Sequence, residues 1–149
     1  MRHFDEALLI RLETDASGFA AAAILSQLHK DQWHPVAFWS RKLIPAERNY
    51  QTHDQELLAI VEAVKHWRHY LEGSHHPFET LTDHRNLQGF MKVKSLNGRQ
   101  ARWAMELAPY DFVIRHRPGV SNPADGPSRR PDYAVGTQEN HLNDILPSL

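Results

Sequence analysis

Strand patterns and helical patterns alternate along residues 8–116 in an order that restricts the folds open to this chain. Leu8, Ile10 and Leu12 alternate with Arg11 and Glu13, which is typical of a strand with one buried face. Two more strand patterns follow directly, and strands adjacent in sequence most simply pair antiparallel. A long helical pattern then precedes a fourth strand, and two helices precede a fifth. This order predicts an α/β fold with a mixed sheet covered by helices.

Turn and cap residues set the approximate limits of these elements. Pro45 suits the first turn of a long helix, and Gly73 closes it. Asn97 is a capping residue for the last helix, which Pro109 stops. The expected strands are residues 8–14, 19–28, 34–40, 78–83 and 110–116, and the expected helices are residues 45–72, 86–91 and 97–108. Three tryptophans in apolar runs are expected in the core rather than on a base-stacking surface: Trp39, Trp67 and Trp103.

The composition excludes several classes of protein. The chain has no cysteine, so it contains no disulfide scaffold, Cys-ligated zinc, iron–sulfur cluster or thiol nucleophile. Its 149 residues, 41% of them hydrophobic and 23% charged, fit one globular domain. No apolar run approaches the roughly 18 residues of a membrane span, and the first residues lack the cleavage site of a secretory signal. We therefore expect an intracellular protein without a membrane segment.

Charge is unevenly distributed although the net charge is -1. Residues 92–130 contain eight Lys and Arg against three Asp and Glu, whereas residues 1–91 contain more acidic than basic residues. A basic block beside an acidic body favours a polyanionic partner. The alternative is that these cations only solvate a helix face. The basic residues considered for contact with a polyanion are Lys92, Lys94, Arg99 and Arg102.

Three carboxylates are placed where purely structural roles explain them poorly. Two of the expected strands end in an aspartate, Asp15 or Asp83, and strand ends are where ligand groups gather in α/β sheets. Each could instead form an Asx turn or cap a helix. Glu56 lies at the margin of an apolar helical stripe, where an unpaired carboxylate is costly. Three such groups close together would repel one another, and a divalent cation such as Mg²⁺ would relieve that repulsion. The pattern favours a metal site that handles phosphate.

Several long stretches carry a family resemblance. LETDASG, WHPVAFWSRKLIPAERNYQTHDQELLAIVEAVKHWRHYLEG, HPFETLTDHRNL and LNGRQARWAMELAPYDFVIRHRPGVSNPADGPSRRPDY closely resemble the ribonuclease H domain of gypsy-like LTR retrotransposon (Metaviridae) Pol polyproteins, from about residue 3 to residue 133. The resemblance implies a ribonuclease H-like fold with a five-stranded mixed sheet flanked by helices.

The resemblance also implies a catalytic set and a mechanism. The matching residues are Asp15, Glu56, Asp83 and Asp125, which would hold two Mg²⁺ ions, with Mn²⁺ as a substitute. It implies two-metal hydrolysis of the RNA strand of an RNA–DNA hybrid, with one ion activating water and the other stabilising the departing 3′ oxygen. His84 matches a further position that would assist proton transfer or orient the substrate. Lys92, Lys94, Arg99 and Arg102 would then contact nucleic-acid phosphates.

Domain limits, partners and location follow from the same resemblance. Residues 1–7 would be a remnant of the preceding reverse transcriptase connection, residues 8–130 the ribonuclease H domain, and residues 131–149 a flexible linker or tail. A polymerase domain of the same polyprotein would be a partner, in cytoplasmic virus-like particles or in the nucleus. The alternative function is a weak or inert hybrid-binding module. Gly126 and Pro127 favour it, because the family usually continues a helix after the position of Asp125.

Overall fold

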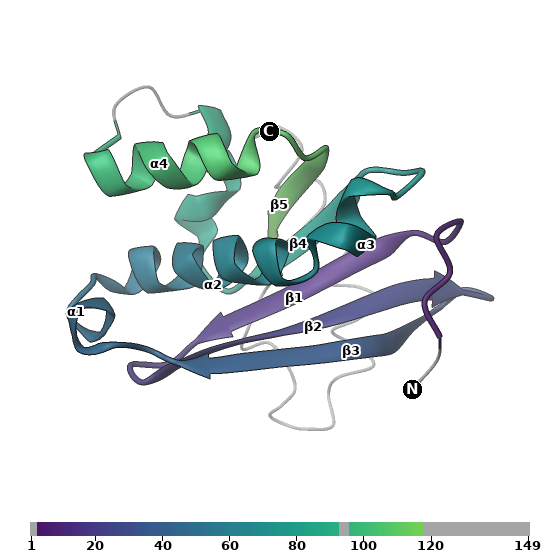
Figure 1. Ribbon diagram of the computed structural model, residues 1–149, viewed down its shortest axis with the longest axis horizontal. Helices are drawn as coiled ribbons and strands as arrows, with labels where there is room; N and C mark the ends of the chain where they lie inside the picture. Colours follow the sequence, from purple (N-terminus) through teal and green to yellow (C-terminus); the bar gives the residue numbers. More distant parts are fainter. Residues whose placement is uncertain (1–2, 93–95, 118–149) are drawn as a thin grey trace.

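A single five-stranded sheet organises the computed structural model, which describes residues 3–92 and 96–117. The strands are arranged in the order β3-β2-β1-β4-β5 (Figure 1). They are β1 (Ile10–Ala16), β2 (Ala20–His29), β3 (Gln32–Lys42), β4 (Phe78–Thr82) and β5 (Phe112–His116). The mixed sheet expected from the pattern order is therefore confirmed.

The first three strands form an antiparallel meander, as the sequence predicted. Lys30 and Asp31 connect β2 to β3 and have positive φ angles of 53° and 65°. Two successive left-handed residues give a tight turn whose twist matches that of the flanking strands. The turn lacks the Asn-Gly or Asp-Gly pair that usually marks this geometry in a sequence.

The last two strands run parallel to β1, with β4 paired to β1 and β5 paired to β4. A parallel pair needs a crossover connection, and the helical region between β3 and β4 supplies it. Parallel neighbours end at the same edge of a sheet. The ends of β1 and β4 are consequently brought to one edge, although 68 positions separate Asp15 from Asp83 in the chain.

The single helix expected over residues 45–72 is wrong, because three helices occupy this region. They are α1 (Pro45–Arg48), α2 (Thr52–His66) and α3 (Arg68–Glu72). Asn49 ends α1. Trp67, with φ -104° and ψ 26°, interrupts the helix between α2 and α3. Trp67 is buried in the core, so its packing fixes the break while the apolar stripe continues on both sides. Helical spacing alone cannot reveal such an interruption.

Two helical segments separate β4 from β5. The first, η1 (Arg85–Lys92), is a 3₁₀ segment kinked at Gly89 rather than a regular α-helix. The second, α4 (Gly98–Leu107), begins as predicted at Asn97, whose side chain accepts a hydrogen bond from the Gln100 backbone N–H at 2.7 Å. Strand β5 then begins at Phe112, two residues later than the predicted strand.

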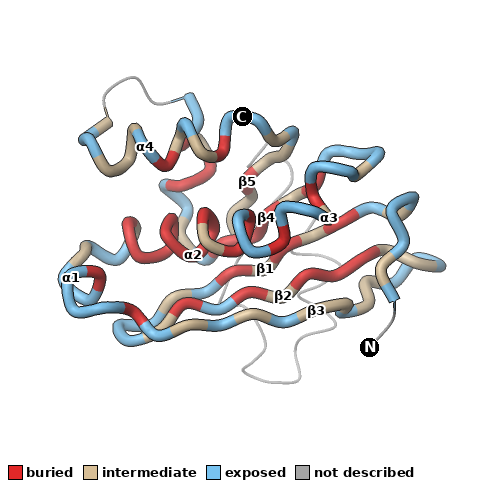
Figure 2. The backbone as a smooth tube through the Cα atoms, in the orientation of Figure 1, coloured by how far each residue is buried: buried red, intermediate tan, exposed pale blue. Residues whose placement is uncertain are grey.

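The core lies between the sheet and α2. Figure 2 shows buried backbone along β1, β2 and α2, and α4 lies on the far side of α2. Leu57, Ile60 and Val64 of α2 pack with Leu12 and Leu25 of the sheet in one hydrophobic cluster. Trp67 and Trp103 are buried in this cluster and Trp39 packs against it, which confirms their expected core role.

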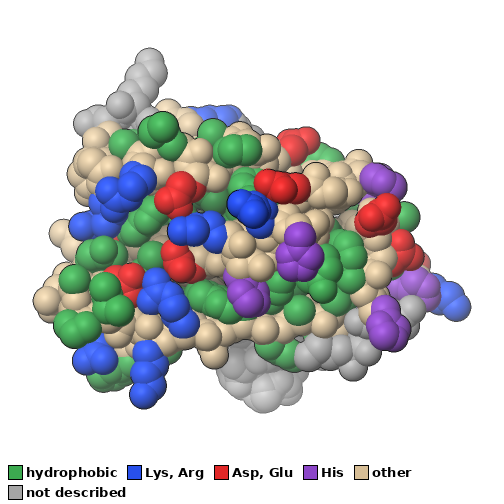
Figure 3. All heavy atoms as spheres, viewed as in Figure 1, with side chains coloured by type: hydrophobic (Ala, Val, Ile, Leu, Met, Phe, Trp, Pro, Cys, Tyr) green, Lys and Arg blue, Asp and Glu red, His purple; other side chains and the backbone are tan. Residues whose placement is uncertain are grey.

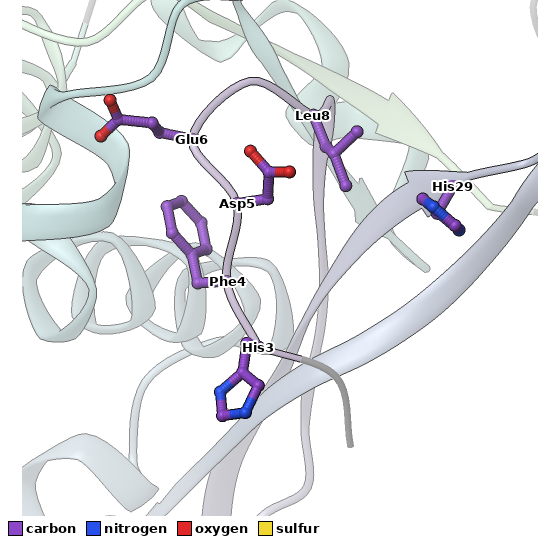
Figure 4. A pocket seen from close by; sticks show the side chains of 6 residues that line it. All are labelled: His3, Phe4, Asp5, Glu6, Leu8 and His29. Carbon is purple, nitrogen blue, oxygen red and sulfur yellow. The ribbon is translucent and has the colours of Figure 1, made fainter.

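The segment before β1 is attached to the domain. Phe4 stacks on Tyr70 of α3 with ring centroids 4.3 Å apart, and Asp5 exchanges backbone hydrogen bonds with the Gln27 side chain at 2.7 and 2.9 Å. This segment lines a pocket of about 660 Å³ that reaches His29. Figure 4 shows the side chains that line it. The segment adjoins the start of β1, opposite the end that carries Asp15.

The predicted tail, residues 131–149, and the predicted site residue Asp125 lie outside the described residues. Among the described helices, none has both the length and the apolar character needed to cross a membrane.

Candidate nuclease site

Three of the four predicted carboxylates come from elements that meet at one edge of the sheet. Asp15 is the penultimate residue of β1, Asp83 directly follows β4, and Glu56 is on α2. Glu13 of β1 is paired with Leu81 of β4, so Asp15 and Asp83 occupy equivalent positions two residues further on. The parallel pairing of β1 with β4 thus brings the two aspartates to the edge that the sequence predicted.

Glu56 is the most strongly perturbed acid of this group. It is only 5% exposed, and its Oε1 atom has no hydrogen-bond partner. Burial, followed by the charges of Asp15 and Asp83, raises the pKa of Glu56 to about 7. The Ala16 backbone N–H and the Arg117 charge act in the opposite direction. A buried carboxylate that keeps an unused oxygen beside two other acids is suited to a bound cation.

Arg117 is a basic residue of this edge that the sequence reasoning missed. Its Nε–H donates to Oδ1 of Asp83 at 3.0 Å, and its Nη1–H donates to Oε1 of Glu13 at 2.9 Å. Its backbone N–H donates to the Thr82 carbonyl, which extends the β4–β5 pairing by one residue. The parallel register of β4 and β5 was the missing information, since it places residue 117 beside residue 83.

Two histidines flank the carboxylates. His84 follows Asp83, and its backbone N–H donates to Oγ1 of Thr82 at 3.2 Å. The His53 ring, one turn before Glu56 on α2, lies 5.7 Å from the His84 ring. Burial, together with His53, lowers the pKa of His84, which keeps its imidazole neutral at pH 7. His53 was not predicted as a site residue. The one sequence signal that could have suggested it is its spacing of three residues from Glu56, which places both on one side of a helix.

The carboxylates of this edge meet the needs of a divalent cation in their chemistry but not in their present arrangement. Carboxylate oxygens are the ligands that Mg²⁺ prefers, and the unpartnered oxygen of Glu56 provides one that is already buried. Within residues 3–92 and 96–117, however, no three Asp, Glu or His side chains converge closely enough to make a ready metal site. Asp83 is instead engaged by Arg117. The chemistry of these residues therefore fits a divalent cation. In their present arrangement, the positive charge beside Asp83 is the guanidinium of Arg117.

Arg99, one of the four predicted phosphate contacts, is engaged inside the domain. Its Nη2–H donates to Oδ2 of Asp54 at 2.7 Å, and its guanidinium lies 3.9 Å from the centre of the Tyr50 ring. Gln100 donates to the other Asp54 oxygen at 2.9 Å. Burial acts to raise the pKa of Asp54, but the hydrogen bonds from Arg99 and Gln100, together with the charges of His53 and Arg99, outweigh burial and lower the pKa. This cluster joins the start of α4 to the start of α2.

The other predicted contacts are distributed differently. Lys92 is exposed at the end of η1 and Arg102 is exposed on α4, whereas Lys94 lies outside the described residues. Figure 3 shows that Lys and Arg side chains of the viewed face gather mainly over α1, α2 and α4, with Asp and Glu between them. This part of the surface is therefore mixed in charge rather than uniformly basic.

The fold agrees with what comparisons with known proteins show. Residues 5–110 match the family model described as the RNase H-like domain found in reverse transcriptase. The chain belongs to this family. It is also similar to the transposon Tf2-3 and Tf2-4 polyproteins of Schizosaccharomyces pombe, each 48% identical over 97% of this chain. The chain spans 12% of the length of these curated relatives.

Solved structures support the same fold. A foamy viral protease-reverse transcriptase in complex with dsDNA has a TM-score of 0.65 at 15% identity, covering 83% of this chain and 26% of that chain. The RNase H domain of PFV has a TM-score of 0.57 at 16% identity, covering 79% and 84%. RNase H1 from Halobacterium salinarum NRC-1 has a TM-score of 0.53 at 15% identity, covering 75% and 87%. The ribonuclease H-like fold, with its five-stranded mixed sheet and helices, is therefore confirmed.

Proposed function

We propose that this domain is a Mg²⁺-dependent endonuclease that hydrolyses the RNA strand of RNA–DNA hybrids. The family supports a nuclease of the ribonuclease H type. One of the similar foamy viral protease-reverse transcriptase structures is in complex with an RNA/DNA hybrid. The acidic edge formed by Asp15, Glu56 and Asp83 would be its catalytic centre.

The observation that carries this proposal is the state of Glu56. The fold buries this carboxylate next to Asp15 and Asp83 and leaves one of its oxygens without a partner. A carboxylate in this environment destabilises the folded chain unless it is protonated or neutralised by a cation. A purely structural role would not require three acids at one edge.

Asp15, Glu56 and Asp83 would hold the metal together with Asp125, and two ions would be held by the four. Divalent ions bound there would supply Lewis acidity, which stabilises charge on phosphate oxygens and on water. His84, beside Asp83, would assist proton transfer or orient the substrate. Lys92 and Arg102, with Lys94, would contact nucleic-acid phosphates, which fix the position of a duplex without reading its sequence.

We infer the biological setting from the relatives. The Tf2 proteins are transposon polyproteins, and this chain would act in reverse transcription by a gypsy-like LTR retrotransposon. An upstream polymerase domain of the same polyprotein would deliver the hybrid. Cytoplasmic virus-like particles are the proposed location.

Cleavage of end-labelled duplexes tests the proposal directly. The full 149-residue chain is incubated with an RNA–DNA hybrid, a DNA duplex and an RNA duplex of one sequence, each with Mg²⁺, Mn²⁺ or EDTA. We expect cleavage of only the RNA strand of the hybrid, and only with a divalent ion. Cleavage that persists in EDTA or that includes the DNA duplex would contradict the proposal.

The same samples separate the alternative function. A folded chain that binds the hybrid in Mg²⁺ but leaves it intact would indicate a hybrid-binding module. Repeating the assay with the polymerase domain attached would then show whether activity depends on that neighbour.

A further inference from the structure

Arg117 is positioned at the acidic edge by the sheet itself. It follows the last pair of the parallel β4–β5 ladder, Thr82 with His116, and its backbone N–H bonds to the Thr82 carbonyl at 2.6 Å. This backbone contact fixes Arg117 next to Asp83, which follows Thr82. The arginine is therefore a built part of the edge, and its side chain is only 17% exposed.

The guanidinium bridges acids from two strands. It pairs with Asp83 after β4 and with Glu13 of β1, at 3.0 and 2.9 Å. A planar guanidinium presents several N–H donors at once and can hold two carboxylates that an ammonium could not hold equally well. Arg117 also influences Glu56, since its positive charge opposes the other causes of that residue's raised pKa.

We propose that Arg117 is a resident counter-ion that occupies the acidic edge without metal and gives up Asp83 when a divalent cation binds. This inference rests on the proposed function in that it assumes the edge binds a cation. Asp83 cannot direct the same lone pairs at Arg117 and at a metal. The edge thus has one state in which Asp83 pairs with Arg117 and another in which Asp83 faces Glu56 and Asp15. Pairing with Glu13 keeps Arg117 at the edge in both states.

Because Arg117 and a divalent cation compete for Asp83, the arginine lowers the apparent affinity of the edge for the cation. If the Arg117–Asp83 pair is formed most of the time, only the remaining fraction of molecules can bind the cation, and the apparent dissociation constant rises by the inverse of that fraction. A pair of this kind populated about nine-tenths of the time would weaken cation binding about tenfold. Removing the guanidinium should therefore tighten cation binding.

The test measures Mn²⁺ binding by the full chain without nucleic acid, using electron paramagnetic resonance of the free ion. Arg117→Gln should tighten binding by roughly three- to tenfold. Arg117→Lys should give a smaller change, because a lysine keeps the charge but cannot bridge both acids. Arg117→Gln combined with Asp83→Asn should lose the gain. Unchanged or weaker binding by a folded Arg117→Gln chain would overturn the proposal.

Arg115→Gln is the matched control. Arg115 is two residues earlier, within β5, points to the same side of the sheet and faces Glu79 at 3.7 Å instead of the acidic edge. Its removal should leave Mn²⁺ affinity within about twofold of the original chain. An equal gain from Arg115→Gln would mean that general charge, not the Asp83 pair, controls binding, and would overturn the proposal.

A measurement on the unaltered chain avoids any dependence on how a variant folds. The Arg117 Nε–H resonance is followed by ¹⁵N NMR as Mg²⁺ is added. It should shift in step with the binding curve as the bond to Asp83 is lost, while the Arg115 resonance stays constant. An Arg117 resonance that does not move while Mg²⁺ binds would overturn the inference.

These results are independent of cleavage. A chain that cleaves hybrids while its Arg117→Gln variant binds Mn²⁺ unchanged would retain the proposed function and lose the inference. A chain that never cleaves, but whose Arg117→Gln variant binds Mn²⁺ more tightly, would retain the inference and lose the proposed function.

Discussion

At the scale of single residues, the decisive group is a carboxylate that the fold buries while leaving one of its oxygens without a hydrogen-bond partner. Glu56 is held among apolar neighbours of α2 while Asp15 and Asp83 approach it from the sheet. In the unfolded chain the Glu56 carboxyl would titrate near 4.5, whereas in the folded chain its pKa is about 7. The folded state therefore holds a proton more tightly than the unfolded state between these values.

This difference predicts how stability depends on pH. Because the folded pKa is raised, the contribution of Glu56 is most favourable below about pH 4.5 and is lost as pH rises through about 7. In EDTA, Glu56→Gln should therefore be more stable than the original chain at pH 8, by about 1–3 kcal/mol, and nearly equal to it at pH 4.5. Urea unfolding at both pH values measures this difference.

Glu72→Gln provides the control for that experiment. Glu72 is an exposed glutamate on α3, and its substitution should change stability by less than about 0.5 kcal/mol at either pH. A Glu56→Gln chain that is less stable than the original at pH 8 in EDTA would contradict the prediction, because it would show that the ionised Glu56 does not destabilise the folded chain.

His84 carries a separate prediction at this scale. Its lowered pKa and its place after Asp83 suit a group that accepts a proton near neutral pH. His84→Ala should slow hybrid cleavage by roughly ten- to a hundredfold while leaving the fold intact. His76→Ala, an exposed histidine before β4, should leave the rate unchanged. An unchanged rate in His84→Ala would remove this residue from the site.

At the scale of elements, the start of α4 is joined to the start of α2 by a buried acid. Asp54 is almost completely enclosed and receives hydrogen bonds from both Arg99 and Gln100. Arg99 also stacks on Tyr50. A charge of this kind is tolerated only while its partners remain. The cluster therefore fixes α4, which carries Arg102, relative to α2, which carries Glu56.

Removing the arginine should loosen this junction. Arg99→Ala leaves Asp54 buried with one partner fewer, and should lower the free energy of unfolding by about 2 kcal/mol. Arg102→Ala, three residues later and exposed, should change it by less than about 0.5 kcal/mol. Urea denaturation at pH 7 distinguishes the two. Equal effects would mean that the Asp54 cluster adds little to stability.

The elements also show where sequence reasoning succeeds and where it stops. Alternating residues such as Leu8, Ile10 and Leu12 predicted the strands, because burial of one face leaves a period of two. The helix break at Trp67 was missed, since a buried tryptophan fits the apolar stripe whether or not the helix continues. Arg117 and the internal engagement of Arg99 were missed because both depend on partners far away in the chain.

At the scale of the whole molecule, charge is arranged around the acidic edge rather than concentrated in one basic face. Two arginines are engaged by nearby acids, Arg117 by Asp83 and Glu13 and Arg99 by the buried Asp54. Lys92 and Arg102 are exposed, and under the proposed function they would contact a phosphate backbone. Such contacts release counter-ions, so they control how binding depends on salt.

This division predicts the salt dependence of hybrid binding. Lys92→Ala and Arg102→Ala should each make the plot of log binding constant against log salt concentration less steep, by about 1. Arg68→Ala, an exposed cation on α3 away from the acidic edge, should leave the slope unchanged. Fluorescence anisotropy in Ca²⁺ across a salt series measures it. Slopes that are unaltered in the Lys92 and Arg102 variants would exclude these residues as phosphate contacts.

The claim that the shared edge of β1 and β4 is a nuclease centre is tested most directly by one pair of variants. Asp83→Asn and Asp111→Asn each remove a single charge with almost no change in shape, but Asp111 lies before β5 at the opposite end of the sheet. With Mg²⁺, Asp83→Asn should slow cleavage of the RNA strand at least about 100-fold, and Asp111→Asn should cleave like the original chain. Full activity in a folded Asp83→Asn chain would contradict the account.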